Sequence, residues 1–149
     1  MSAMIDFEID TVIPRPIEEV FDRLVDIDGY SNWLPESEVF VDCRKTSEGP
    51  VDVGTKYRDE TRYGVIPGEV VAFERPTKVT FENRARWHGR SLMETRPSYV
   101  LEPVDGGTRV RLLAEAELHG LFKLVRPFVS LRARKERSRT LEALARSLD

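Results

Sequence analysis

The stretch GTKYRDETRY places a carboxylate among tyrosines at alternate positions of the chain. Alternate residues of a strand share one side, and one side here holds Thr55, Tyr57, Asp59, Thr61 and Tyr63. The residues between them are all Lys, Arg or Glu, so they must face solvent and the Asp59 side must be covered. Burial beside tyrosines would raise the pKa of Asp59 and suit it to act as an acid or base on an enolisable ligand. The alternative is an ordinary ion pair between Asp59 and an arginine.

Two later strands add polar and aromatic side chains to the same covered face. They contribute Val79, Phe81 and Asn83, and then Met93, Thr95, Tyr99 and Leu101. A face that served only as core would be mainly Val, Ile and Leu, because each buried hydroxyl or amide without a partner costs about 1–3 kcal/mol. The mixture predicts a mostly apolar pocket with a few directing polar groups. The alternative is that these groups pair with one another or lie at the wet edge of the sheet.

The segment RARKERSR, Arg132 to Arg139, is basic in a chain whose net charge is −3. One interpretation is a solvated helix face. Another is that Arg134, between Leu131 and Leu141 on the helix, reaches the pocket and holds a ligand carboxylate, a phenolate or Asp59 with its two-pronged guanidinium. An acidic lipid headgroup or membrane surface is a third alternative.

The aromatic residue Trp33 lies in YSNWLP, Tyr30 to Pro35, between a helical pattern and a strand pattern. As a core plug it would pack under the C-terminal helix. As a gate it would line the pocket mouth together with Tyr30 and Leu34. The catalytic candidates are Asp59 and Tyr57, and the candidate ligand-binding residues are Trp33, Tyr57, Asp59, Tyr63, Phe81, Asn83, Met93, Tyr99 and Arg134.

Other kinds of reactive site have little support in the sequence. His88 and His119 have no second His, Cys or carboxylate at metal-ligand spacing, so we expect no metal site. Cys43 has no histidine nearby in sequence and is expected to be a buried, inert thiol. No Gly-rich phosphate loop and no Gly-x-Ser-x-Gly elbow occurs. We therefore expect no cofactor.

Length and composition predict one domain, 1–149, with its own core. The negative net charge argues against nucleic acid as a partner. The single cysteine suits a reducing, cytoplasmic location. The opening MSAMIDFEID is acidic and strand-like, unlike a secretory signal, and no apolar run is long enough to span a bilayer. We expect no stable membrane insertion and a monomer or homodimer.

The elements that position these residues can be followed along the chain. Residues 4–13 alternate as a half-buried strand, and PIEEVFDRLVDI is a short amphipathic helix that Gly29 ends. From 39 to 118 the pattern is a meander of strands, making seven in all. From Gly120 to the end the pattern is helical, and one apolar stripe is expected to hold Leu124, Phe128, Leu131, Leu141, Leu144 and Leu148. This long helix is expected to cover the sheet.

Three segments in this order carry a family resemblance: PIEEVFDRLVDIDGYSNWLP after the first strand, GEVVAFERPTKVTFE in the middle, and SYVLEPVDGGTRV before the last strand. The chain resembles the helix-grip or START-like (SRPBCC) superfamily, most of all its polyketide cyclase/dehydrase branch. DGYSNWLPES also resembles the branch that binds ubiquinone-type lipids. The resemblance implies an α+β helix-grip fold: a seven-stranded curved antiparallel sheet around a long C-terminal helix, with two short helices between strands 1 and 2.

The same resemblance implies an apolar cavity between sheet and helix, and it favours partial exposure of Trp33 to that cavity. Our first hypothesis is the binding, transport or sequestration of one small hydrophobic or aromatic molecule. The second is a polyketide cyclase or dehydratase that uses the same cavity, with Asp59, Tyr57 or a helix arginine polarising a carbonyl. The third is a ubiquinone-type lipid-binding protein, or a protein-interaction module with a filled core.

Overall fold

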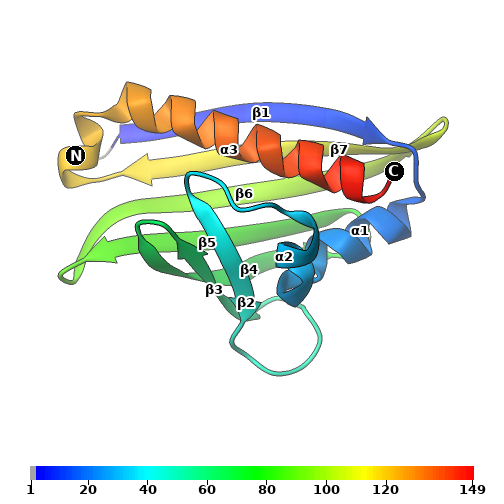
Figure 1. The fold of residues 1–149 in the computed structure, drawn as a ribbon, viewed down its shortest axis with the longest axis horizontal. Helices are drawn as coiled ribbons and strands as arrows, with labels where there is room; N and C mark the ends of the chain where they lie inside the picture. Colours follow the sequence, from blue (N-terminus) through cyan, green and yellow to red (C-terminus); the bar gives the residue numbers. More distant parts are fainter. Residues whose placement is uncertain (1–2) are drawn as a thin grey trace.

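The computed structural model describes residues 3–149, so the expected domain, 1–149, begins two residues before the described part. The seven strands form one antiparallel sheet, as the sequence predicts, and the structure gives the strand order β1-β7-β6-β5-β4-β3-β2 (Figure 1). Its strands are β1 (Ala3–Ile13), β2 (Phe40–Lys45), β3 (Lys56–Thr61), β4 (Gly64–Glu74), β5 (Lys78–Trp87), β6 (Arg90–Val104) and β7 (Gly107–Leu118). Because β1 pairs with β7, the first and last strands lie side by side.

Helices cover one face of this sheet. They are α1 (Ile17–Val25), α2 (Tyr30–Trp33) and α3 (Arg126–Ser147), with single 3-10 turns at η1 (Ile27–Gly29) and η2 (Gly120–Lys123). The long helix α3 runs beside β1, and α1 and α2 lie near its C-terminal end (Figure 1). The helix-grip fold is confirmed, including the two short helices between strands 1 and 2. No helix of residues 3–149 combines the length and the apolar character that crossing a membrane requires.

The short helix α1 forms as its sequence predicts. Pro16 precedes its first residue, and Glu18 and Glu19 lie in the first turn, where negative charge favours the helix dipole. The side chains on its apolar face are buried against the sheet, and the ring of Phe21 meets the edge of Phe73 at 5.4 Å. This helix closes the end of the main core that the C-terminal part of α3 also covers.

The third strand is shorter than the sequence pattern suggests. It ends at Thr61, which pairs with Gly64, so Arg62 and Tyr63 form a two-residue turn into β4. Gly64 has a φ of 127°, a conformation that side-chain-bearing residues rarely adopt. Tyr63 is 80% exposed. The prediction that Tyr63 lies on the covered face is wrong, because the strand alternation stops where the hairpin closes.

The apolar stripe expected along α3 is split into two. Leu141, Leu144 and Leu148 are buried in the main core, whereas Leu124, Phe128 and Leu131 are 70–79% exposed. Phe128 and Leu144 are 16 residues apart. At 3.6 residues per turn this is about 4.4 turns, which places them on nearly opposite sides of the helix. The single stripe was therefore wrong for its first half, where Phe122 and Val129 pack towards the sheet instead.

Candidate functional site

Three aromatic rings form a ladder across the covered face. Tyr57 on β3 meets Phe81 on β5 edge to face at 5.8 Å, and Phe81 meets Tyr99 on β6 in the same way at 6.1 Å. All three side chains are buried. Edge-to-face pairs of this kind are favourable beyond the area they bury. The ladder is a rigid, apolar floor, and the sequence predicted all three of its members on this face.

A close backbone approach allows Tyr57 to reach across the sheet. Its ring lies over Gly68 of β4, where an added Cβ would be 2.2 Å from Tyr57 Cζ. The Tyr57 hydroxyl thus donates a hydrogen bond to Asn83 Oδ1 at 2.5 Å, and Asn83 Nδ2 donates to Thr95 Oγ1 at 3.1 Å. Burial is the main reason that the pKa of Tyr57 is raised. The hydroxyl of Tyr57 and the amide of Asn83 are satisfied by protein partners, which is the alternative that the sequence left open.

The carboxyl of Asp59 differs from its neighbours because one oxygen is unpaired. Asp59 lies directly across the β2–β3 ladder from Cys43. Its Oδ1 atom is buried and has no hydrogen-bond partner within the described part of the chain. Burial raises the pKa of Asp59 to about 6, although the positive charge of Arg137 lowers it. Burial also raises the pKa of the Cys43 thiol, with the negative charge of Asp59 as the next cause, so this thiol is unreactive.

The helix arginine that faces this site is Arg137. Its charge lowers the pKa of Asp59, and it opposes the pKa increase that burial causes at Tyr99, both through charge and through a hydrogen bond. It also lines a cavity of about 30 Å³ beneath α3, together with Thr95 and Ala133. This volume is enough for about one water-sized group. Sequence reasoning missed Arg137, although Arg137 lies four residues before the buried Leu141 and therefore on the same helix face.

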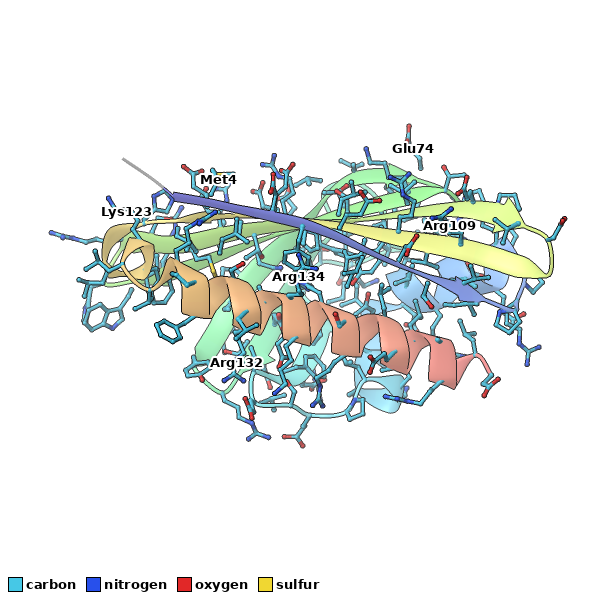
Figure 2. The ribbon with its side chains drawn as sticks, turned by 90° about the horizontal axis from the view of Figure 1, so that it is seen from above. Met4, Glu74, Arg109, Lys123, Arg132 and Arg134 are labelled. Atoms are coloured by element: carbon cyan, nitrogen blue, oxygen red, sulfur yellow. The ribbon has the colours of Figure 1, made fainter. Side chains whose placement is uncertain are left out.

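Arg134 does not occupy that position. Its guanidinium lies over the ring of Phe7 on β1, with Cζ 4.8 Å from the ring centre. Figure 2 shows Arg134 between α3 and β1, with Arg132 on the opposite side of the helix. The prediction that Arg134 is the arginine of the pocket is corrected to Arg137. Three residues turn an α-helix by about 300°, so the two side chains lie about 60° apart around α3, one at its edge and one on its inner face.

The aromatic residue Trp33 packs on the core and also lines an open groove. Its ring is 4.8 Å from that of Tyr30, whose hydroxyl donates to the Leu24 carbonyl at 2.6 Å. Both rings pack against the main core. The groove, of about 350 Å³, runs between α1, α2 and the end of α3, where Arg23 and Arg146 also line it. Trp33 Nε1 is buried and has no hydrogen-bond partner among residues 3–149.

The remaining candidate, Met93, is half-buried and packs against a small second core group with Ile5, Ala116 and Leu118. Phe122 of η2 and Val129 of α3 pack against this group.

One cluster of metal-ligating side chains appears that spacing along the chain did not reveal. Single ligand atoms of Glu94, Glu117 and His119 lie within 4.8 Å of one another. Glu94 and Glu117 are paired across β6 and β7, and Glu94 Oε1 is 3.1 Å from His119 Nε2. Glu94 Oε1 also accepts from Ser91 Oγ at 2.8 Å, and that hydrogen bond is the main reason that the pKa of Glu94 is lowered. Hydrogen bonds of Glu94 hold two of the three side chains together, and exposed acidic groups commonly cluster without a metal.

Residues 4–149 match the family model for polyketide cyclase / dehydrase and lipid transport proteins. The chain belongs to this family. No protein with a curated description matches it by sequence.

Solved structures agree with the family in fold. A protein from Mesorhizobium loti has a TM-score of 0.74 at 18% identity, with 97% of each chain covered. The di-domain ARO/CYC StfQ from the steffimycin biosynthetic pathway has a TM-score of 0.74 at 11% identity, over 95% of this chain and 49% of that one. Ara h 8.0201 has a TM-score of 0.74 at 16% identity, with 98% of each chain covered. At these identities the likeness concerns the fold alone.

Proposed function

We propose that the protein binds one small hydrophobic or aromatic molecule between the sheet and α3, that the water-sized cavity lined by Arg137 widens to take it, and that the polar end of this molecule meets Asp59 and Arg137. The observation that carries this proposal is the buried Asp59 Oδ1, which has no hydrogen-bond partner within residues 3–149. An unsatisfied buried acceptor costs about 1–3 kcal/mol. A hydroxyl or amide donor on a ligand would remove that cost, so Asp59 would select for molecules that carry one.

The surroundings of Asp59 favour an aromatic or otherwise flat ligand. The ladder of Tyr57, Phe81 and Tyr99 offers apolar ring surface, and the Tyr57 hydroxyl proton and the Asn83 amide oxygen and nitrogen already have partners. A ligand would therefore gain polar contacts chiefly at Asp59 and Arg137 and apolar contacts elsewhere. The matched family includes lipid transport in its description, which fits carriage of such a molecule. A single free, buried cysteine suits a protein of the reducing cytoplasm.

A titration with polyketides, quinones, fatty acids and sterols tests this proposal. The chain has two tryptophans, and Trp87 is 65% exposed, so a Trp87→Phe variant leaves Trp33 as the only indole reporter. We expect a change in Trp33 emission and a rise in Tm with at least one ligand that carries a hydroxyl or amide donor. Asp59→Asn should lower the affinity for that ligand. Glu60→Gln, a change at the next residue of the strand, should leave the affinity unchanged. No response across the whole panel would refute the proposal.

An enzymatic use of the same site is a second candidate, favoured by the pKa of about 6 at Asp59. A carboxyl with a pKa near neutrality can both accept and return a proton. In a dehydration, Asp59 would take a proton from the carbon next to a carbonyl and return it to the departing hydroxyl, so that water and an enone form. Arg137 would polarise the carbonyl oxygen. Mass spectrometry of a β-hydroxyketone incubated with wild type and Asp59→Asn would show product only with wild type.

If Asp59→Asn formed the same product at the same rate, Asp59 would have no part in a reaction. Binding without any product in the wild type would favour carriage.

A further inference from the structure

Exposed apolar side chains gather at one end of the molecule. In an antiparallel sheet with this order, the β3–β4 turn, the β5–β6 turn and the β7–α3 connection all lie at the same end of the strands. Of the exposed large apolar residues among 3–149, only Val12 and Val53 lie towards the other end. The rest are Met4, Tyr63, Val65, Trp87, Leu121, Leu124, Val125, Phe128 and Leu131.

Four of these residues make a continuous surface that we call the α3 apolar face: Leu121, Leu124, Phe128 and Leu131. They are 70–79% exposed. Within α3, a spacing of three places Phe128 and Leu131 on one side of the helix, and Leu121 and Leu124 lie in and directly after the η2 turn that leads into it. The opposite side of the same segment is fixed to the sheet, because Phe122 and Val129 pack on the core group of Ile5 and Leu118. The α3 apolar face is therefore held outward by the fold.

The segments around this face are rich in basic residues, and two of these, Arg132 and Arg84, are paired with Glu38 and Glu82. Residues 119–135 contain five Lys or Arg and no Asp or Glu, although the chain has a net charge of −3. Residues 83–93, which hold the β5–β6 turn and the exposed Trp87, contain three Arg and again no acid. Lys135 continues the line of Leu124, Phe128 and Leu131, four residues after Leu131. Lys123 and Met4 mark this end of the molecule in Figure 2.

We propose that the α3 apolar face docks onto the surface of an anionic lipid bilayer. Its Leu and Phe side chains would enter the boundary between headgroups and acyl chains, and Lys135 and the neighbouring cations would contact the lipid phosphates and carboxylates. An outward apolar line with basic residues beside it is typical of helices that lie in a membrane interface. The α3 apolar face lies outside the site formed by Asp59 and Arg137. The inference therefore does not depend on the ligand proposed for Asp59.

Charge argues against a second copy of the chain as the occupant. A symmetric dimer through the α3 apolar face would bring the same surface against itself. Residues 119–135 of both copies would then face one another. Each copy brings five cations, of which Arg132 is paired with Glu38, and facing like charges oppose association. An anionic bilayer complements both parts of this end, because its acyl chains suit the apolar side chains and its headgroups suit the cations.

Binding to lipid vesicles tests the proposal with the whole chain. Co-sedimentation would compare vesicles of phosphatidylcholine alone with vesicles in which one third is phosphatidylserine. We expect binding to the second kind and not the first, and weaker binding as salt is added. Phe128→Ser/Leu131→Ser should lower the affinity about tenfold or more. Lys135→Gln should lower it about fivefold, the effect expected of one cation near an anionic surface.

The matched control is Val12→Ser/Val53→Ser, which removes exposed apolar side chains at the opposite end and should leave vesicle binding unchanged. Circular dichroism should show the same secondary structure for all variants. Absence of binding to the phosphatidylserine vesicles, equal binding to both kinds, or unchanged affinity in Phe128→Ser/Leu131→Ser would overturn the proposal. Sedimentation showing a dimer that this double variant dissociates would overturn it too, in favour of a second copy.

Discussion

The substitution Asp59→Asn should stabilise the protein at neutral pH and have a smaller effect in acid. Asp59 is held on the covered face with one oxygen unpaired, and burial raises its pKa from 3.8 to about 6 despite the charge of Arg137. The folded state therefore resists ionisation of this carboxyl. An asparagine cannot ionise, so the variant avoids the cost of a buried charge.

The sign and size of the effect follow from the two pKa values. Between pH 3.8 and about 6 the folded state keeps the proton while the unfolded chain has lost it. The unfolding free energy of the wild type must then fall as pH rises through this range, because the folded state binds more protons. Each pKa unit corresponds to about 1.4 kcal/mol, so the loss reaches about 3 kcal/mol above pH 6. The variant should gain that amount relative to wild type between about pH 4 and about pH 7.

Urea denaturation of both proteins across this pH range measures the difference directly. Other titrating groups are common to both proteins and cancel in the comparison. Asp42→Asn, one strand away, is a control of opposite sign, because a hydrogen bond from Arg44 lowers the pKa of Asp42. Asp42 thus stabilises the fold above its ordinary pKa, and its variant should lose stability relative to wild type as pH rises. A difference for Asp59→Asn that stays constant with pH, or falls, would refute the reasoning.

Three further outcomes are expected. Gly68→Ala should lower the unfolding free energy by about 1–3 kcal/mol in urea denaturation, because its Cβ would displace Tyr57 from Asn83; an unchanged midpoint would contradict the close approach. Leu144→Ala should cost about 2–5 kcal/mol, whereas Phe128→Ala should change stability by less than about 0.5 kcal/mol; similar losses would mean a single buried stripe. Arg137→Gln should raise the pKa of Asp59 further in a carbon-detected NMR titration, since Arg137 lowers it now; an unchanged value would place Arg137 elsewhere.

Local sequence patterns predict much of the fold. The alternation in β1 and β7 predicts which side chains the sheet buries, and the structure buries them, as with Ile5, Ile13 and Leu112. The acidic first turn and apolar face of α1 predict a helix that the structure contains. These predictions succeed because a period of two or of 3.6 depends only on neighbouring residues and on the need to cover one face.

The sequence also predicted which residues share the covered face. It did not predict which of their polar groups form hydrogen bonds with one another. Alternation placed Tyr57, Asp59 and Asn83 on one side, as the structure does. It could not show that Tyr57 passes over Gly68 to reach Asn83, which leaves Asp59 as the unpaired group. Hydrogen bonds between residues far apart in sequence depend on which strands become neighbours, and a glycine within a strand is the only local sign of such an approach.

The sequence by itself determined the seven strands, the three helices and the covered side of β1, β5, β6, β7 and most of β3, because these follow from local periodicity and steric rules. Only the tertiary structure decided how α3 is rotated against the sheet. That rotation turns Arg137 inward and Arg134 towards Phe7, and it leaves Phe128 exposed although its sequence pattern is apolar. The reason is that a helix longer than its core can bury only the part of its surface that meets the sheet.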